Sequence, residues 1–193
     1  MLKVAIVVGS TRPGRKSEPV AQWVLKLAQT RKDAEFELLD PAAFNLPLLD
    51  EPVPPSMQKY SKDHTKAWSA AVARFDAYVF ITPEYNHGPA AALKNAIDFV
   101  YHEWTNKAAG FVSYGTTGGV RAVEQLRQVM AEIQIADVRG HVSLSLFTDF
   151  EKFTTFTPAA SHEPQLMVML DQVVTWGTAM KGVREAAKAK AAA

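Results

Sequence analysis

The sequence predicts a three-layer α/β fold, a parallel sheet with helices on both faces, as a single domain over residues 1–193. Short apolar runs at residues 4–8 and 78–81 are β-branched or aromatic and end abruptly in turn residues, which is typical of buried parallel strands. Segments with apolar residues at helical spacing alternate with such runs along the chain. No repeat or linker interrupts this alternation, so we expect one core.

The first elements are a strand at residues 3–8, a helix from 17 or 18 to about 30, and a strand at 35–40. Ser17 is the predicted N-cap of this helix, and Pro19 suits its first turn. The second strand alternates apolar and polar residues, which predicts an edge position with one wetter side.

A proline-rich connection follows at residues 41–57. Connections of this length inside a compact domain are often functional. Two interpretations remain open: the connection folds over a ligand crevice, or it is a surface loop that covers the body of the protein.

The rest of the chain keeps the alternation. Helices are predicted at residues 60–75, 90–101, 120–133 and 164–187, and strands at 77–82, 108–113 and within 137–146. The tail, residues 186–193, is rich in Ala and Lys and is expected to fray. We expect right-handed crossovers and the flavodoxin-like strand order 2-1-3-4-5, which places the first and third strands side by side at the switch point of the sheet.

The composition excludes several function classes. The formal net charge is +1, so nothing favours nucleic acid or an acidic membrane surface as a partner. The chain has no cysteine, which excludes disulfides, thiolate metal sites and a cysteine nucleophile. No apolar run reaches the roughly 18–20 residues of a membrane span, and the start lacks a signal-peptide pattern, so we expect a cytoplasmic location. The five histidines show no metal-ligand spacing, so we expect no metal.

Residues 9–17, directly after the first strand, are suited to a phosphate. Ser10, Thr11 and Ser17 offer hydroxyl donors, and Arg12 can fork onto phosphate oxygens. The start of the following helix adds backbone N–H groups and the positive end of a dipole. The segment is neither a P-loop of the Gly-Lys-Ser/Thr type nor the G-x-G-x-x-G of dinucleotide-binding folds. A tight turn with solvated arginines explains these residues about as well.

Residues 83–89, directly after the third strand, are suited to the edge of a planar ring. Pro83 fixes φ and removes a donor, and the residues after it must present backbone N–H groups outward. The candidate ring-binding residues are Pro83, Glu84, Tyr85, Asn86 and His87. Glu84 is expected to order the loop and not to act as a general acid. The alternative is an ordinary turn with an exposed tyrosine.

A third loop, residues 113–119, contains only small residues apart from Tyr114. Small residues let a planar ring approach the backbone closely. The candidates here are Ser113, Tyr114, Gly115, Gly118 and Gly119. Because the three loops meet at one edge of the predicted sheet, they indicate a ligand with a phosphate at one end and a ring at the other, which is a mononucleotide.

Segments 7–15, 83–98 and 113–122 together resemble the NADPH-dependent FMN reductase family, the flavodoxin-like quinone, azo and chromate reductases. The resemblance extends from residue 3 to about residue 146. It implies FMN as the cofactor and NADPH or NADH as the electron donor.

The resemblance also implies roles for single residues. Ser10, Arg12 and Ser17 would hold the FMN phosphate, the second loop would edge the isoalloxazine ring, and the third loop would close its other side. Some relatives carry a serine and an asparagine soon after the position of Ser17, where this chain has residues 18–20 of the sequence Glu-Pro-Val. Arg15, or backbone N–H groups alone, are therefore alternative phosphate ligands.

The implied activity is the ping-pong reduction of a small electrophilic acceptor, such as a quinone, azo, chromate or nitro compound. No side chain is expected to be catalytic, because the flavin carries the chemistry. Arg12 and Arg15 are also hypothesised to favour the 2′-phosphate of NADPH. The family implies a homodimer or tetramer, for which Phe99, Tyr101 and Trp104 would offer aromatic surface. A place in the buried core is the alternative for Phe99.

Four alternatives stay open. These alternatives are a free-FMN reductase that releases reduced FMN, an electron carrier, a redox-sensing flavoprotein, and a phosphate-binding regulator without flavin. Electron carriers of this fold are typically strongly acidic, and a net charge of +1 gives no steering field toward a basic partner.

Overall fold

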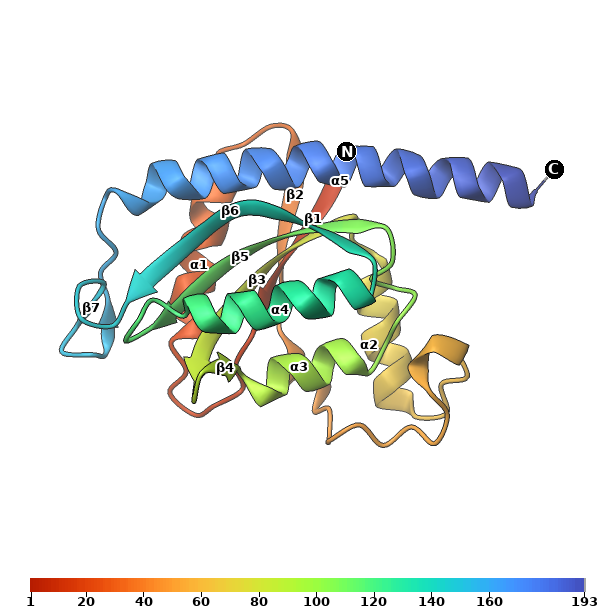
Figure 1. The fold of residues 1–193 in the computed structure, drawn as a ribbon, viewed down its shortest axis with the longest axis horizontal. Coiled ribbons are helices and arrows are strands. Elements are labelled where there is room, and N and C mark those ends of the chain that lie inside the picture. The colour runs from red at the N-terminus through yellow and green to blue at the C-terminus, as the bar shows by residue number, and fades with distance from the viewer. Residues whose placement is uncertain (193) are drawn as a thin grey trace.

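The computed structural model describes residues 1–192 and is built on a twisted parallel sheet in the order β2-β1-β3-β5-β6 (Figure 1). The strands are β1 (Leu2–Val8), β2 (Ala34–Leu39), β3 (Ala77–Tyr85), β5 (Lys107–Gly115) and β6 (Ile135–Ser145). A short strand, β4 (Gly88–Pro89), adds an antiparallel partner to the end of β3. Without β4 the order is the predicted 2-1-3-4-5, and β2 has the predicted edge position.

Helices cover both faces of the sheet, as predicted (Figure 1). The helices α1 (Ser17–Ala28) and α5 (His162–Ala191) lie on one face, and α2 (Asp63–Ala73), α3 (Ala91–Asp98) and α4 (Val120–Glu132) lie on the other. A hydrophobic core lies on each face of the sheet, and successive side chains of a strand point to opposite faces. In β1, Val4 and Ile6 pack in the core under α1 and α5, whereas Ala5 and Val7 pack in the core on the other face. Both faces of the sheet are therefore buried, which explains why the strands appear in the sequence as continuous apolar runs.

Several boundaries differ from the predictions. β3 continues three residues further than expected, through Tyr85. The predicted N-cap is wrong: Lys16 precedes the first helical residue, and Ser17 lies inside the helix, fully buried, with its hydroxyl donating to Ser10 O at 3.5 Å. The last helix runs through Ala191, so the predicted fraying is not seen over residues 186–191, and residue 193 lies outside the described residues.

The proline-rich connection between β2 and α2 contains two short 3₁₀ helices, Pro41–Phe44 and Pro55–Met57. It packs on α2 and α3, and its first part lies beside the first loop, because Pro41, Ala42 and Asn45 line a cavity with Thr11. Phe44 meets Trp68 of α2 with ring centroids 5.0 Å apart, and the Asn95 side chain of α3 accepts from Leu49 N at 2.9 Å. These contacts with α2 and α3 favour the surface-loop interpretation.

A hairpin that the sequence analysis missed follows β6. Its two strands, β7 (Phe150–Glu151) and β8 (Thr155–Phe156), have only two residues each. It lies at the carboxyl end of β6 (Figure 1).

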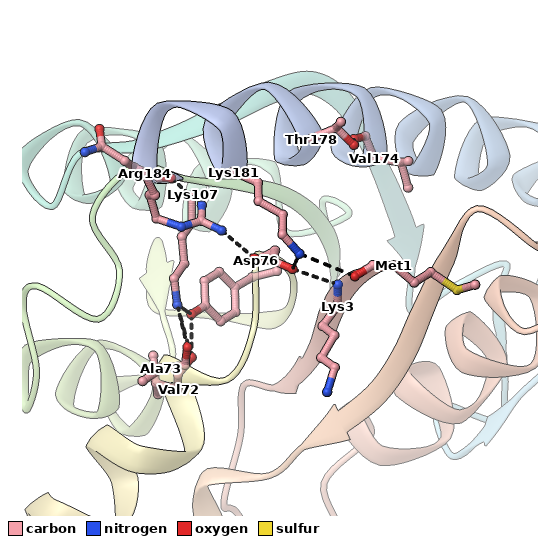
Figure 2. A network of polar contacts seen from close by, with 12 residues as sticks. Met1, Lys3, Val72, Ala73, Asp76, Lys107, Val174, Thr178, Lys181 and Arg184 are labelled. Atoms are coloured by element: carbon pink, nitrogen blue, oxygen red, sulfur yellow. Dashed lines mark hydrogen bonds and ion pairs between the residues drawn. The ribbon is translucent and has the colours of Figure 1, made fainter. Parts of the chain in front are cut away.

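At the amino ends of the strands, a polar network around Asp76 connects the sheet to α5 (Figure 2). The Asp76 carboxylate accepts from Lys3 N at 3.1 Å and from Lys181 Nζ at 3.1 Å, and it pairs with Arg184. Burial opposes ionisation of this group, but these donors prevail and lower its pKa. The network holds the carboxyl-terminal part of α5, which reaches beyond the sheet.

Lys107 enters the same region from β5 and is nearly fully buried. Its ammonium donates to Tyr78 Oη at 2.9 Å and to Val72 O at 3.3 Å, a carbonyl at the end of α2 (Figure 2). Burial lowers the pKa of Lys107 to about 7, and the charge of Arg184 adds to this shift.

Among residues 1–192, no helix has the length and apolar character to cross a bilayer.

Candidate functional site

The first loop joins the ends of β1 and β3. Gly9 N donates to Ile81 O at 2.9 Å, and a Cβ atom on Gly9 would lie only 2.0 Å from that oxygen, so this position requires glycine. Ser10 is buried, accepts from Arg12 N at 3.3 Å and lies 3.1 Å, Oγ to Oη, from Tyr85. The structure thus brings the first and second loops together, as the strand order predicted.

Arg15 is engaged within the protein. Its guanidinium donates to Ser10 O at 2.9 Å and forks onto Asp40, at 2.9 Å to Oδ1 and 2.5 Å to Oδ2. The hydrogen bond to Asp40 raises the pKa of Arg15 despite partial burial. Arg12 is exposed and stands 6.0 Å from the centre of the Tyr85 ring. Arg12 is therefore the freer cation for a phosphate, and Arg15 shapes the loop.

The second loop is a β-hairpin. Glu84 pairs with Pro89 and Tyr85 with Gly88, so Asn86 and His87 form its tip, with φ values of 48° and 74°. Both tip residues are exposed. The backbone oxygen of His87 accepts from the Gln125 side chain of α4 at 2.6 Å, which fixes the tip against that helix.

Glu84 connects the second loop to the third. Its carboxylate accepts from Arg121 N at 3.2 Å in the first turn of α4, accepts from Thr117 Oγ1 at 3.4 Å, and forms an ion pair with the Arg121 guanidinium. Burial opposes ionisation, but the contacts with Arg121 outweigh it and lower the pKa of Glu84. This geometry agrees with the expected loop-ordering role.

The third loop is held by hydroxyl groups behind it. Ser113 Oγ donates to Gly118 O at 2.6 Å, and His141 Nε2 lies 2.7 Å from the same Oγ. Burial lowers the pKa of His141 to about 4, so the ring is neutral at pH 7 and its Nε2–H donates to Ser113. Gly118 and Gly119 have φ values of 73° and 76°, a conformation that favours glycine. Sequence reasoning missed His141, because only strand pairing brings β6 beside Ser113.

A cavity of about 140 Å³ lies where the three loops meet. Its lining includes seven of the predicted residues: Arg12, Arg15, Pro83, Glu84, Tyr85, Tyr114 and Gly115. Sequence reasoning missed four others, Pro13, Gly14, Lys16 and Leu146, of which the first three lie within the predicted segment.

The other predicted residues lie outside this lining. Ser10, Ser17 and Ser113 are buried behind the loops, and Gly118 and Gly119 shape the third loop. Thr11 lines a separate cavity of about 440 Å³ beside the proline-rich connection, and Asn86 and His87 are at the exposed hairpin tip.

The chemistry of the lining fits the phosphate end of FMN. The Tyr114 hydroxyl is buried beside Ser17 without a well-formed hydrogen bond among residues 1–192, and burial raises its pKa. Buried hydroxyls normally have a partner, so this group is available to a ligand oxygen. Arg12 and Lys16 add positive charge, and the start of α1 adds backbone N–H groups.

Across the described part of the chain, no three His, Asp or Glu side chains are grouped to hold a metal.

We expect Tyr114→Phe to weaken FMN binding about 5- to 10-fold while leaving the free energy of unfolding unchanged or slightly higher. The substitution removes a hydroxyl that has no well-formed hydrogen bond within the protein but would donate to a ligand oxygen, a bond worth about 1 kcal/mol. Fluorescence titration with FMN and urea denaturation measure the two effects. A loss of stability with unchanged FMN affinity would show that the hydroxyl serves the fold instead.

A larger cavity lies elsewhere on the protein. About 1000 Å³ of open groove lies between α3 and α4, with an apolar wall that includes Ile97, Val100 and Val129. It has no phosphate-binding loop, and we assign the chemistry to the smaller cavity. Two expectations about this surface are wrong: Phe99 and Trp104 are fully buried in the core and offer no aromatic surface, whereas Tyr101 is half-buried beside the groove.

Comparison with known proteins places this geometry in a family context. The family model described as NADPH-dependent FMN reductase matches residues 2–149. An NAD(P)H-dependent FMN reductase from Nectria sp is 44% identical over 158 residues, covering 77% of this chain and 79% of the relative. A quinone reductase from Pseudomonas putida is 29% identical over 189 residues, covering 90% and 93%. The flavoenzyme NAD(P)H:(acceptor) oxidoreductase FerB from Paracoccus denitrificans shares the fold, with a TM-score of 0.72 and 21% identity over 93% of this chain and 99% of that one.

Proposed function

This chain belongs to the NADPH-dependent FMN reductase family, and from that premise we propose that it reduces a small quinone-like acceptor with electrons from NAD(P)H. Membership confirms the family predicted from the three loops, and with it FMN and NAD(P)H as the cofactors. The match to a quinone reductase over nearly the whole chain supports a quinone-like acceptor.

The observation that carries the site assignment is one cavity lined by Arg12, Lys16 and Tyr114, whose buried hydroxyl has no well-formed hydrogen bond among residues 1–192. These groups, with Ser10 and the start of α1, would hold the phosphate of FMN. Bound FMN supplies the hydride and electron transfer that no side chain of this chain can provide.

The remaining loops would position and tune the ring. The backbone of β3 at Pro83–Tyr85 would edge it, and backbone N–H groups after Tyr114 would stabilise negative charge that develops at its pyrimidine end. Glu84 and the Ser113–His141 pair act on these loops from behind by hydrogen bonding. Because His141 is neutral at pH 7, it adds no positive charge there.

An anaerobic titration of the FMN-loaded protein with NADPH tests the proposal. We expect the visible flavin absorption to bleach and to return when benzoquinone is added, with parallel double-reciprocal plots for the two substrates. Retained flavin that stays oxidised would favour the electron carrier or the redox sensor. Flavin that leaves the protein on each turnover would favour the free-FMN reductase.

The α3–α4 groove supports a second copy of this chain as the partner. Gly88 and Pro89 of the second loop line one end of the groove, so a second copy seated there would reach the site. We expect the wild type to have at least dimer mass in light scattering and Val129→Arg to be monomeric, because arginine would place a bulky charged side chain in the apolar wall of the groove. Val168→Arg, on the exposed face of α5, is the matched control. A monomeric wild type would contradict this assignment. We also propose that the protein acts in the cytoplasm.

A further inference from the structure

An exposed pair of aromatic rings stands beside the candidate site. Phe147 and Phe153 are 65% and 51% exposed, and their rings pack edge to face with centroids 5.4 Å apart. We call this pair the aromatic platform. Phe147 follows β6, and Phe153 lies in the connection between β7 and β8.

The connection that presents Phe153 is strained. Lys152 and Phe153 have φ values of 50° and 58°, a region that bulky residues rarely adopt. The same phenylalanine is exposed to water, which is also unfavourable. Strained backbone tends to persist where function requires it, and Asn or Gly would make this turn at lower cost. A large ring at this position is therefore a feature that needs a functional reason.

The base of the platform is rigid. Asp149 is buried and accepts from Ser145 N at 2.8 Å and from Ala159 N at 3.0 Å, which closes the segment around it. Phe150 is buried and packs on Tyr114, with ring centroids 5.9 Å apart. The hairpin is thus fixed to a residue that lines the cavity.

The platform continues the chain from a residue of the cavity wall. Leu146 lines the cavity and donates its N–H to Gly115 O at 3.0 Å, and Phe147 is the next residue. Neither ring of the platform belongs to the lining. Figure 1 places the hairpin at the carboxyl end of β6, on the side of the sheet where the loops gather. A ligand reaches the platform only if it extends out of the cavity.

We propose that the aromatic platform binds the adenine ring of the NAD(P)H donor, an inference that rests on the proposed function. The donor has two ring systems joined by a diphosphate, and its nicotinamide would lie against the flavin ring that the second and third loops are proposed to hold. The adenine then extends outward, where an aromatic face stacks on any base. Lys152 adds a positive charge beside the platform for the phosphates. A small acceptor has no second ring system to place there.

The test compares NADH with reduced nicotinamide mononucleotide, which lacks the adenosine half. We expect Phe147→Ala and Phe153→Asn to raise the KM for NADH between about 5- and 100-fold, the range that removal of base-stacking aromatics produces. The KM for the truncated donor should not change. Asparagine favours positive φ, so Phe153→Asn removes the ring while keeping the turn. Trp176→Ala, which removes an exposed aromatic from α5, is the matched control and Phe153→Trp the conservative rescue.

Saturation-transfer NMR with ADP gives a readout independent of turnover. ADP should bind the wild type and Trp176→Ala but not Phe147→Ala or Phe153→Asn. An equal rise in KM for both donors, or unchanged ADP binding in the platform variants, would overturn the proposal. So would a shift to smaller particles in light scattering of the platform variants, since it would make the platform an interface between copies. If neither donor bleaches the flavin of the wild type, the proposed function fails, and ADP binding still decides whether the platform takes adenine.

Discussion

Glu84→Ala is expected to weaken FMN binding about 100-fold. The Glu84 carboxylate joins the second loop to Thr117 and to Arg121 at the start of α4, so its removal frees the second and third loops, which are proposed to hold the flavin ring, and leaves Arg121 without its partner. Loss of several hydrogen bonds to a charged group costs about 3 kcal/mol, which corresponds to that factor. Fluorescence titration with FMN measures the change.

Glu84→Gln keeps an acceptor but loses the ion pair, so it should fall between the wild type and Glu84→Ala. The control is Glu124→Ala, a more exposed carboxylate on α4 that pairs with Arg127 at 3.5 Å. Urea denaturation of all variants separates loop ordering from global stability. If Glu84→Ala binds FMN as tightly as Glu124→Ala does, Glu84 does not order the site.

Lys107→Met is expected to abolish a rise in stability with pH. The unfolded chain keeps the lysine proton to about pH 10.4, whereas the folded protein releases it at about pH 7 because the ammonium is buried. Between these values the unfolded state binds more protons, so the free energy of unfolding of the wild type increases with pH. The increase from pH 7 to 9.5 should be about 3 kcal/mol.

Guanidinium denaturation at several pH values tests this expectation. The Met variant should show a nearly flat profile over this range and exceed the wild type at pH 6, where the wild type must bury a charged ammonium. Lys181→Met, in the same network but more exposed on α5, should keep the wild-type slope. A Lys107→Met profile that rises as steeply as the wild type would mean that Lys107 stays protonated in the folded protein.

Local pattern predicted most of the fold, and the misses have physical causes. Buried strands and amphipathic helices leave periodic signals, so the alternation and the strand order were predicted correctly. β3 is longer than predicted because Glu84 and Tyr85 pair with β4 across the Asn86–His87 turn. This turn depends on positive φ values at both residues, and hydrophobic periodicity gives no sign of them. β7 and β8 are too short to show a period and are stabilised by contacts such as Phe150 with Tyr114.

The candidate site was predicted as a set of loops and not as a set of contacts. Loop position follows from topology, so the first, second and third loops do meet at one cavity. Whether Arg15 points at a ligand or at Asp40 depends on packing between residues far apart in the sequence, and the same is true of His141 and Ser113. Such pairings need the three-dimensional structure.

The affinity of the protein for FMN compared with riboflavin tests the central claim most directly. The two flavins differ only in the phosphate. In the proposed site this phosphate would lie among Arg12, Lys16, Tyr114 and the start of α1. Several charge-assisted hydrogen bonds should make FMN bind at least about 100-fold more tightly. Equal affinities for FMN and riboflavin, or no binding of either, would contradict the assignment of this cavity as the FMN phosphate site.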